Sequence, residues 1–248
     1  MFFLRLKGGL GNQLFQVVYA LDRASHDEVV WVDLSTYNDS FEDDYAGKNV
    51  EVDQIISDRR LRYFSLPLVL SKIFWKVVSK FEFLQIKCLD GYFYNASLYD
   101  KKSDYSDLLR FKFQNNYSKS DVLIHVRKGD YVNGVNSKVF YNCDVEYFSK
   151  AISLISTKVA SPNFFVMTND ENWVLKNFDF IDYTFLPQTN SVDGFKEMCE
   201  FKNFIISNSS YSWWAAMFSG SRCVVAPRLW YLTQSNEDLY PSGWILID

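Results

Sequence analysis

The chain has 248 residues, of which 48% are hydrophobic, and its formal net charge is −4. A chain of this length and composition can bury a large core, so we expect a globular protein with one large domain or two smaller ones. The acidic balance excludes a global basic field of the kind that binds DNA or RNA, although it permits a local phosphate site. Nucleic acid is therefore not an expected partner.

Cysteine and histidine are too few and too scattered to predict a metal site. The four cysteines form no Cys-x-x-Cys pair, only two histidines could join them, and no Asp-x-Asp triplet occurs. We therefore expect no metal and no other cofactor. The sequence also shows no secretory signal and no apolar run near the roughly 20 residues that span a bilayer. These features predict a cytoplasmic protein, with at most transient contact with the inner membrane surface.

The chain opens with a strand pattern at residues 2–6. The sequence Lys-Gly-Gly-Leu-Gly-Asn-Gln follows at residues 7–13 and leads into a helical apolar pattern. Gly8 is expected to make a tight turn, whereas Gly9 and Gly11 would let the backbone approach a ligand. The opening therefore predicts a strand, a turn and a helix, with a ligand near the turn.

The two amides that end this turn have alternative roles. Asn12 and Gln13 can donate to a phosphate or a sugar hydroxyl, but Asn12 can also serve as a helix N-cap, which needs no ligand. A Gly-x-Gly turn after a first strand also begins the dinucleotide fingerprint of an NAD(P)-dependent oxidoreductase. Its third glycine would fall at Leu14, and Asp33 matches the acidic ribose-binding residue only loosely. The sequence therefore speaks against a dinucleotide site.

The rest of the first half is less regular. A strand is expected at residues 29–32, and an apolar helical region at residues 61–78. The polar segment 114–121 suits a surface connection between domains. We therefore predict an N-terminal domain over 1–115 and a C-terminal domain over 116–248.

The second half alternates short apolar runs with helical patterns. Strands are expected at residues 122–126, 164–167, 204–207 and 223–225. Helices are expected at residues 145–155, 171–177, 194–199 and 211–218. Such alternation is typical of an α/β protein whose parallel sheet is covered on both faces.

The strand at residues 122–126 ends in a charged turn, in which Arg127 is always protonated and carries a fork of donors that matches phosphate oxygens. The alternative for Arg127 is a surface ion pair with Asp130. His125 either donates to a phosphate or satisfies a turn carbonyl. Asp130 is expected to orient Arg127 or to cap the next segment rather than to act as a base.

The stretch at residues 204–217 also reads as strand, small-residue turn and helix. Its turn contains Asn208, Ser209 and Ser210, whose polar groups and free backbone N–H groups at a helix start suit a diphosphate. The helix continues with Trp213 and Trp214. Adjacent tryptophans on a helix point in different directions, so at least one belongs to the core.

Together the three segments resemble the bacterial α-1,2-fucosyltransferases of glycosyltransferase family 11. The family pattern has a Gly-rich opening that ends in Gly-Asn-Gln, then His-x-Arg-Arg-x-Asp-Tyr, then Asn-Ser-Ser-x-Ser-Trp-Trp, and all three occur here in that order. The resemblance implies a GT-B fold of two Rossmann-like domains that face a cleft, with the donor mostly on the C-terminal domain and the acceptor on the N-terminal one. It also implies inverting transfer of L-fucose from GDP-L-fucose to the 2-hydroxyl of a terminal galactose-type acceptor. Such transfer belongs to the assembly of cell-surface glycans, O-antigen or capsule, on an acceptor that can be lipid-linked.

The resemblance also assigns roles to single residues. Arg127 corresponds to the first Arg of the second motif and would bind the β-phosphate, while Lys128 stands where the second Arg is usual and lacks its planar fork. By its position Asp193 would read the guanine edge, unless it only caps the following helix; Asp170 is the second candidate. The candidates for catalysis are then Asn12, His125, Arg127 and Asp130. A noncatalytic nucleotide-sugar binder remains the alternative from another class.

Overall fold

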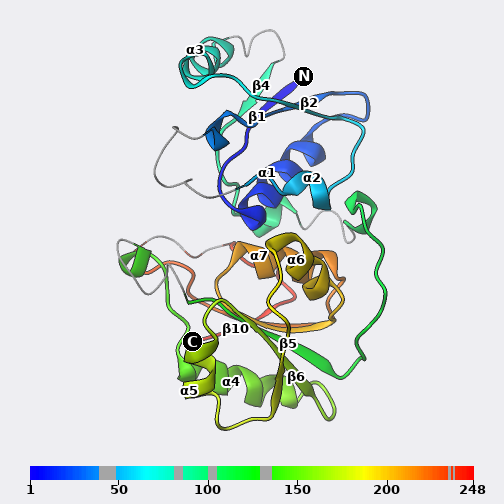
Figure 1. Cartoon of the computed structure of the whole chain (residues 1–248), viewed down its shortest axis with the longest axis vertical. Helices are drawn as coiled ribbons and strands as arrows, with labels where there is room; N and C mark the ends of the chain where they lie inside the picture. The colour runs from blue at the N-terminus through cyan, green and yellow to red at the C-terminus, as the bar shows by residue number, and fades with distance from the viewer. Residues whose placement is uncertain (39–48, 81–85, 100–104, 129–135, 234–235, 237) are drawn as a thin grey trace. The chain divides into compact units, whose positions relative to one another are not determined.

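The computed structural model describes the whole chain except residues 39–48, 81–85, 100–104, 129–135, 234–235 and 237 (Figure 1). The chain forms two compact units. The first consists of Met1–Tyr94 and Leu108–Arg110, and the second consists of Asn95–Asp107 and Phe111–Asp248. Each unit is built around a parallel sheet of its own, which confirms the α/β class.

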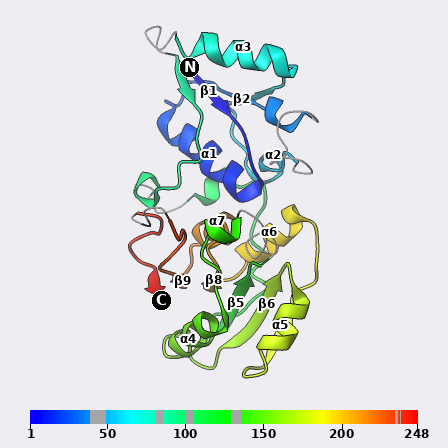
Figure 2. The same ribbon diagram turned by 90° about the vertical axis from the view of Figure 1, so that its left-hand side faces the viewer.

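The first unit has a sheet of four parallel strands in the order β3-β2-β1-β4. The strands are β1 (Phe2–Arg5), β2 (Val30–Asp33), β3 (Leu61–Phe64) and β4 (Lys87–Leu89). The α-helices of this unit are α1 (Leu10–Arg23), α2 (Val52–Ile55) and α3 (Leu68–Val78). Figures 1 and 2 show α1 and α3 on opposite faces of the sheet, so alternate residues of β1 pack against different helices.

The predicted opening is confirmed by β1 and α1, and the predicted second strand by β2. The helix predicted over residues 61–78 is wrong in its first part, because Leu61–Phe64 form β3 and pair with β2. Helix α3 begins after Pro67, its N-cap residue. Proline disfavours the helical conformation in the residue before it, so a helix through this point would have been strained. Burial of Leu61 beside Val30 favours the strand instead.

The second unit has six parallel strands in the order β10-β9-β8-β5-β6-β7. The strands are β5 (Asp121–Val126), β6 (Asn163–Thr168), β7 (Tyr183–Phe185), β8 (Asn203–Ile206), β9 (Cys223–Pro227) and β10 (Ile245–Ile247). The helices are α4 (Val145–Ser156), α5 (Glu171–Asn177), α6 (Ser191–Cys199) and α7 (Ser210–Phe218). Short 3₁₀ turns in the chain cover Ser35–Tyr37, Ala96–Leu98, Ser106–Leu108 and Asn136–Lys138. The predicted parallel sheet is confirmed, with two edge strands that the sequence did not reveal.

The strand order of this sheet is that of a doubly wound Rossmann fold. Two successive strands extend from β5 on one side, and the chain then returns to place β8 and two more strands on the other side. This connection reverses the direction of winding between β5 and β8. Helix α7 follows β8 and buries both Trp213 and Trp214 completely, so both tryptophans belong to the core.

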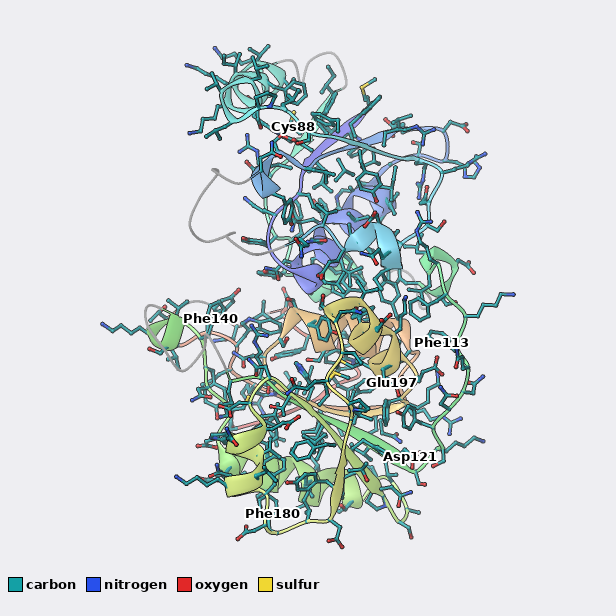
Figure 3. All side chains as sticks on the ribbon, viewed as in Figure 1. Cys88, Phe113, Asp121, Phe140, Phe180 and Glu197 are labelled. Atoms are coloured by element: carbon teal, nitrogen blue, oxygen red, sulfur yellow. The ribbon has the colours of Figure 1, made fainter. Side chains whose placement is uncertain are left out.

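The two units of the structure are not separated at one point, whereas the sequence predicts a single boundary after residue 115. Asn95–Asp107 groups with the second unit because Tyr99 and Tyr105 are buried there, with ring centroids 5.2 and 5.9 Å from that of Trp214. The polar segment that follows Asn95–Asp107 is hydrogen-bonded to α6 and to Glu200, the residue directly after α6. Glu200 accepts the backbone N–H groups of Gln114 and Asn115, and Glu197, labelled in Figure 3, accepts the Tyr117 hydroxyl. The acceptor-side and donor-side roles of the two domains stay predictions.

Asp33 at the end of β2 fastens α3 to the first unit. Its carboxylate is fully buried. One oxygen accepts the backbone N–H of Ser35 at 2.9 Å, and the other accepts Trp75 Nε1 at 2.5 Å and the Ser71 hydroxyl at 3.3 Å. Two of these donors lie on α3, so one carboxylate satisfies buried polar groups of both the strand end and the helix.

Replacing Asp33 with Ala should therefore destabilise the protein strongly. The substitution leaves several buried donors without an acceptor, and we expect a loss of about 2–4 kcal/mol in the free energy of unfolding, measured by urea denaturation. Asp27→Ala is the matched control, because the Asp27 side chain is 95% exposed and its ion pair with Arg59 is 3.9 Å long. The control should change stability by about 0.5 kcal/mol or less. Equal effects of the two substitutions would contradict the assigned role of Asp33.

Candidate functional site

Two of the segments singled out in the sequence meet at the carboxyl ends of β5 and β8, which are neighbouring strands (Figure 2). Ser207, the first residue after β8, connects them. Its N–H and its hydroxyl donate to the carbonyl oxygen of His125 at 3.1 and 3.0 Å. The same hydroxyl oxygen accepts the backbone N–H of Arg127 at 3.0 Å. The backbone of Arg127 is thereby fixed beside the turn that leads into α7.

This meeting point is also where the winding of the sheet reverses. In open parallel sheets, ligands bind outside the carboxyl ends of the strands at such a reversal. The structure places Arg127, which is partly exposed, at the carboxyl end of β5. Asp130, the proposed ion-pair partner of Arg127, lies outside the described residues. The position of Arg127 therefore suits an anionic ligand, and its role in binding a phosphate stays a prediction.

Lys128 points into the protein, where its side chain is only 2% exposed. Its ammonium donates to Asn142 Oδ1 at 2.9 Å and to the carbonyl oxygen of Cys143, and it lies 3.8 Å from the ring centroid of Trp173. Burial lowers its pKa from 10.5 to about 8. Its backbone N–H donates to Asn169 Oδ1 at 2.9 Å, at the end of β6. These contacts make Lys128 a positioning residue that fixes the backbone directly beside Arg127.

The polar residues of the turn before α7 differ in exposure: Asn208 and Ser209 are buried, and Ser210 is partly exposed. The Asn208 side chain is buried, donates to the carbonyl oxygens of Tyr141 and Trp230 at 2.8 and 3.0 Å, and accepts from the Cys143 thiol at 3.8 Å. Asn208 thus holds two other loops of the unit in place. Its predicted contact with a ligand finds no support in this geometry, because its amide donors already have protein partners.

Ser209 and Ser210 stand at the start of α7. Ser209 is the N-cap residue, and its side chain makes no capping hydrogen bond. Ser210 is partly exposed. The first N–H groups of a helix have no acceptor within the helix and favour a negative charge. The start of α7 therefore follows the strand next to that of Arg127, while contact of Ser209, which is only 5% exposed, and of Ser210 with a diphosphate stays a prediction.

The carboxylates proposed for guanine take part in helix capping. Asn190 is the N-cap residue of α6, accepts the backbone N–H of Asp193 at 2.9 Å and donates to the Asp193 carboxylate at 2.7 Å. Asp193 is therefore the partner of the cap rather than the cap itself, and its side chain is 58% exposed beside Lys196. Asp170 is the N-cap residue of α5 and accepts the backbone N–H of Trp173 at 2.9 Å.

Asn12 and Gln13, the two amide side chains that follow the glycine turn of the first unit, differ in exposure. Gly9, not Asn12, is the N-cap residue of α1, which corrects the capping alternative for Asn12. Gln13 is fully buried, donates to the carbonyl oxygens of Gly8 and Asn49, and accepts the N–H groups of the segment that enters α2. All its hydrogen-bonding capacity serves the protein. Asn12 is partly exposed and remains a candidate for binding a ligand.

The glycines of this turn also have distinct roles. Gly8 has φ +84°, and a Cβ there would lie 2.6 Å from Asn12 Nδ2, so the turn requires glycine at this position, as predicted. A Cβ on Gly9 would meet no atom within 4 Å. The open space beside Gly9 is consistent with a close approach of a ligand to the backbone. Gly11 is buried in the first turn of α1, so its predicted contact with a ligand has less support.

Ser207 is the positioning residue that the sequence did not reveal. Its position at the end of an apolar strand made it look like the last residue of that strand. The sequence signal that could have identified Ser207 was a hydroxyl at the carboxyl end of a buried strand, directly before the polar turn. The side-chain network around Lys128 was also missed, because Asn142 and Trp173 lie far from it in the sequence.

The comparison with known families decides the class of the protein. The chain matches the model of Glycosyl transferase family 11 over residues 1–248. It belongs to this family. The resemblance predicted from the three motifs is therefore confirmed over the whole length of the chain.

Two curated relatives from Escherichia coli agree with this assignment. The O-antigen biosynthesis glycosyltransferase WbnK is 27% identical, and the alignment covers 97% of this chain and 98% of the relative. An alpha-1,2-colitosyltransferase is 30% identical over 140 residues, which cover 52% of this chain and 48% of the relative.

Membership in glycosyltransferase family 11 removes the oxidoreductase alternative, and the structure gives a physical reason. Leu14, where the dinucleotide fingerprint has its third glycine, is fully buried in α1. Asp33, where the ribose-binding acid would stand, is buried and bonded to Ser35, Ser71 and Trp75. Neither position of this glycosyltransferase can serve a dinucleotide.

His125 lies at the candidate site of this glycosyltransferase and has a buried ring nitrogen that is not bonded to any described residue. Its side chain is 6% exposed, and its Nδ1 has no hydrogen-bond partner among the residues that the structure describes. Burial, and secondarily the charge of Arg127, lower its pKa from 6.5 to about 3. The imidazole is therefore neutral at neutral pH. A neutral ring can still donate one hydrogen bond to a ligand.

The lowered pKa predicts an acid sensitivity of folding. Below pH 6.5 the unfolded chain binds a proton at His125 and the folded chain does not, so stability falls as the pH decreases toward 3. His125→Phe should reduce this slope by up to about 1.4 kcal/mol per pH unit, measured by urea denaturation at several pH values. The exposed His26 supplies the control variant His26→Phe. An unchanged slope in His125→Phe would contradict the neutral buried imidazole.

Proposed function

We propose that this chain is an inverting α-1,2-fucosyltransferase, which moves L-fucose from GDP-L-fucose to the 2-hydroxyl of a terminal galactose-type acceptor. The observation that carries the proposal is the position of Arg127. It stands at the carboxyl end of β5, where the winding of the sheet reverses, with its backbone tied through Ser207 to the turn that begins α7. A forked cation next to a helix start is a site for a diphosphate.

The chemistry of transfer explains why such a site is needed. The bond between the anomeric carbon and the β-phosphate oxygen breaks, so negative charge grows on the diphosphate while positive charge grows on the sugar. Fixed donors that meet the leaving group only as its charge develops lower the barrier. Arg127 supplies a cation for this step, and the N–H groups at the start of α7 supply oriented dipoles. The acceptor hydroxyl loses its proton to a base that we do not assign.

Metal independence is part of the proposal. The sequence lacks the Asp-x-Asp pair, and within the described residues no three His, Cys, Asp or Glu side chains gather into a group that could hold an ion. Arg127 and the helix start would carry the charge stabilisation instead. We also propose a GT-B arrangement, with the donor on the second unit and the acceptor on the first. In the first unit, Gly9 and Asn12 would contact the ligand.

The biological setting follows from the relatives. The name of WbnK points to O-antigen biosynthesis, and we propose the same class of process for this chain: the assembly of O-antigen or capsule on the cytoplasmic side of the membrane. The colitosyltransferase suggests a second donor. Colitose is L-fucose without its 3-hydroxyl, so one site can suit either sugar, and a donor panel should contain both GDP-sugars.

Removal of Arg127 tests the proposal directly. Arg127→Ala should lower kcat by about 10²-fold or more, because the loss of one donor to the developing charge costs about 3 kcal/mol. Arg127→Lys should restore only part of the rate, since the charge returns without the fork. Fucosyl transfer to a galactoside, with linkage analysis of the product and with EDTA present, is the measurement.

Arg222→Ala is the matched control for this experiment. Arg222 is exposed and directly precedes β9, so it lies at the amino end of a parallel strand, whereas Arg127 lies at the carboxyl end of β5; its loss should leave kcat within about twofold. Wild-type turnover in a folded Arg127→Ala protein would contradict the phosphate role. Tight binding of GDP without turnover on any acceptor would instead favour the noncatalytic binder, and dependence on added Mg²⁺ or Mn²⁺ would contradict metal independence.

The guanine assignment has its own test, because the cap of α6 can be removed separately. If Asp193 accepts from the guanine edge, Asp193→Ala should weaken GDP binding by at least tenfold and narrow the difference between GDP and ADP, measured by calorimetric titration. Asn190→Ala is the control: it removes the cap, costs about 1 kcal/mol of stability and leaves the base preference intact. If both variants keep the preference for GDP, the guanine contact belongs elsewhere, and Asp170 is the next candidate.

A further inference from the structure

Helix α3 exposes an apolar surface that the proposed transfer reaction does not use. Four of its apolar side chains are largely exposed: Val69 at 67%, Leu70 at 53%, Ile73 at 53% and Val77 at 46%. At 100° per residue, these four positions fall within an arc of about 100° on the helix. A surface helix normally presents polar residues to water, so this outer face of α3 (Val69, Leu70, Ile73 and Val77) is unusual.

The opposite side of α3 is occupied by the first unit itself. Ser71 and Trp75 are buried and donate to Asp33. Phe74 packs edge-on against Phe3 and Phe64, with ring centroids 5.2 and 5.5 Å apart. The helix is therefore apolar on both sides, and its inner contacts fix which side faces outward. Rotation of α3 to bury the outer face would break the bonds to Asp33.

The charged residues of α3 itself have one sign. Lys72 and Lys76 lie on α3 and are exposed, and Lys80 follows two residues after its end and is exposed as well. The helix contains no Asp or Glu, although the whole chain has a net charge of −4. Lys72 and Lys76 are one turn apart, so they form a row beside the apolar arc. A partner for this surface must accept apolar side chains and carry negative charge.

We propose that α3 docks the protein on an anionic lipid bilayer, with the outer face in the boundary between headgroups and acyl chains and the lysines at the phosphates. An apolar face with basic residues beside it is the pattern of helices that lie in the plane of a membrane surface. Spanning is excluded for α3 by its 11 residues, and none of the described helices is long and apolar enough to cross a membrane.

A second copy of the chain fits this surface less well. A helix of 11 residues is about 16 Å long, and one face of it offers far less than the roughly 800 Å² per partner of a stable protein interface. Two copies of α3 face to face would also bring their lysines together. A bilayer has neither problem, because it accepts a single helix face and its anionic lipids attract each lysine.

Flotation with lipid vesicles tests the docking. The full chain should float with vesicles of equal parts phosphatidylcholine and phosphatidylglycerol, and much less with phosphatidylcholine alone. Leu70→Ser with Ile73→Ser should lower the partition coefficient by at least tenfold, since both side chains already face solvent and the fold is kept. Lys76→Glu with Lys80→Glu should remove the preference for anionic vesicles, and high salt should weaken wild-type binding in the same way.

The matched control removes an apolar side chain that is equally exposed elsewhere. Leu175 on α5 is 62% exposed, so Leu175→Ser should leave flotation unchanged. No binding of the wild type to anionic vesicles, or unchanged binding of the Leu70→Ser, Ile73→Ser variant, would overturn the proposal. A wild-type dimer in sedimentation that this variant converts to a monomer would assign the surface to a second copy instead. The vesicle experiment needs no sugar nucleotide, so its failure would leave the proposed fucosyl transfer untouched.

Discussion

The hydrogen bonds of Ser207 join the two halves of the second unit's site. One hydroxyl accepts from the backbone N–H of Arg127 and donates to the carbonyl oxygen of His125, across two adjacent strands. The chain winds away from β5 and from β8 in opposite directions, so the winding of the sheet reverses at this point. The Ser207 bridge ties the backbone at the end of β5 to the backbone at the end of β8. The proposed phosphate role of Arg127 depends on this bridge, because the bridge fixes the backbone of Arg127 beside the turn that begins α7.

Buried polar side chains keep the neighbouring loops in place around this bridge. Lys128 and Asn208 reach into the protein and satisfy carbonyl oxygens of loops that are distant in sequence. An unmet buried amide or ammonium is costly, so each of these side chains strongly favours one loop arrangement. The Lys128 ammonium on the face of Trp173 also explains how a lysine can replace the arginine usual in the family. Its role here is to fix the backbone beside Arg127, for which one compact cation is sufficient.

The sequence predicted the helices and strands better than the roles of individual residues within them. Period and composition located β5, β8 and α7 because a parallel sheet covered on both faces leaves continuous apolar runs. The helix expected at residues 61–78 was half wrong, since apolar content alone does not separate a short strand from a helix. The short edge strands β4, β7 and β10 have only three residues each and leave almost no periodic signal.

The candidate site shows why the roles of individual residues were harder to predict than the helices and strands. Asn208 and Ser209 are adjacent polar residues of one motif, yet Asn208 bonds inward and Ser209 stands at a helix start. Gln13 and Asn12 differ in the same way, since the first is buried with partners for all its polar groups and the second is partly exposed. Sequence spacing cannot separate such neighbours, because a residue that positions a ligand-binding loop and one that binds the ligand need the same donors. The separation depends on where each backbone turn directs its side chain: the amides of Gln13 and Asn208 bond inside the protein, whereas Asn12 is partly exposed.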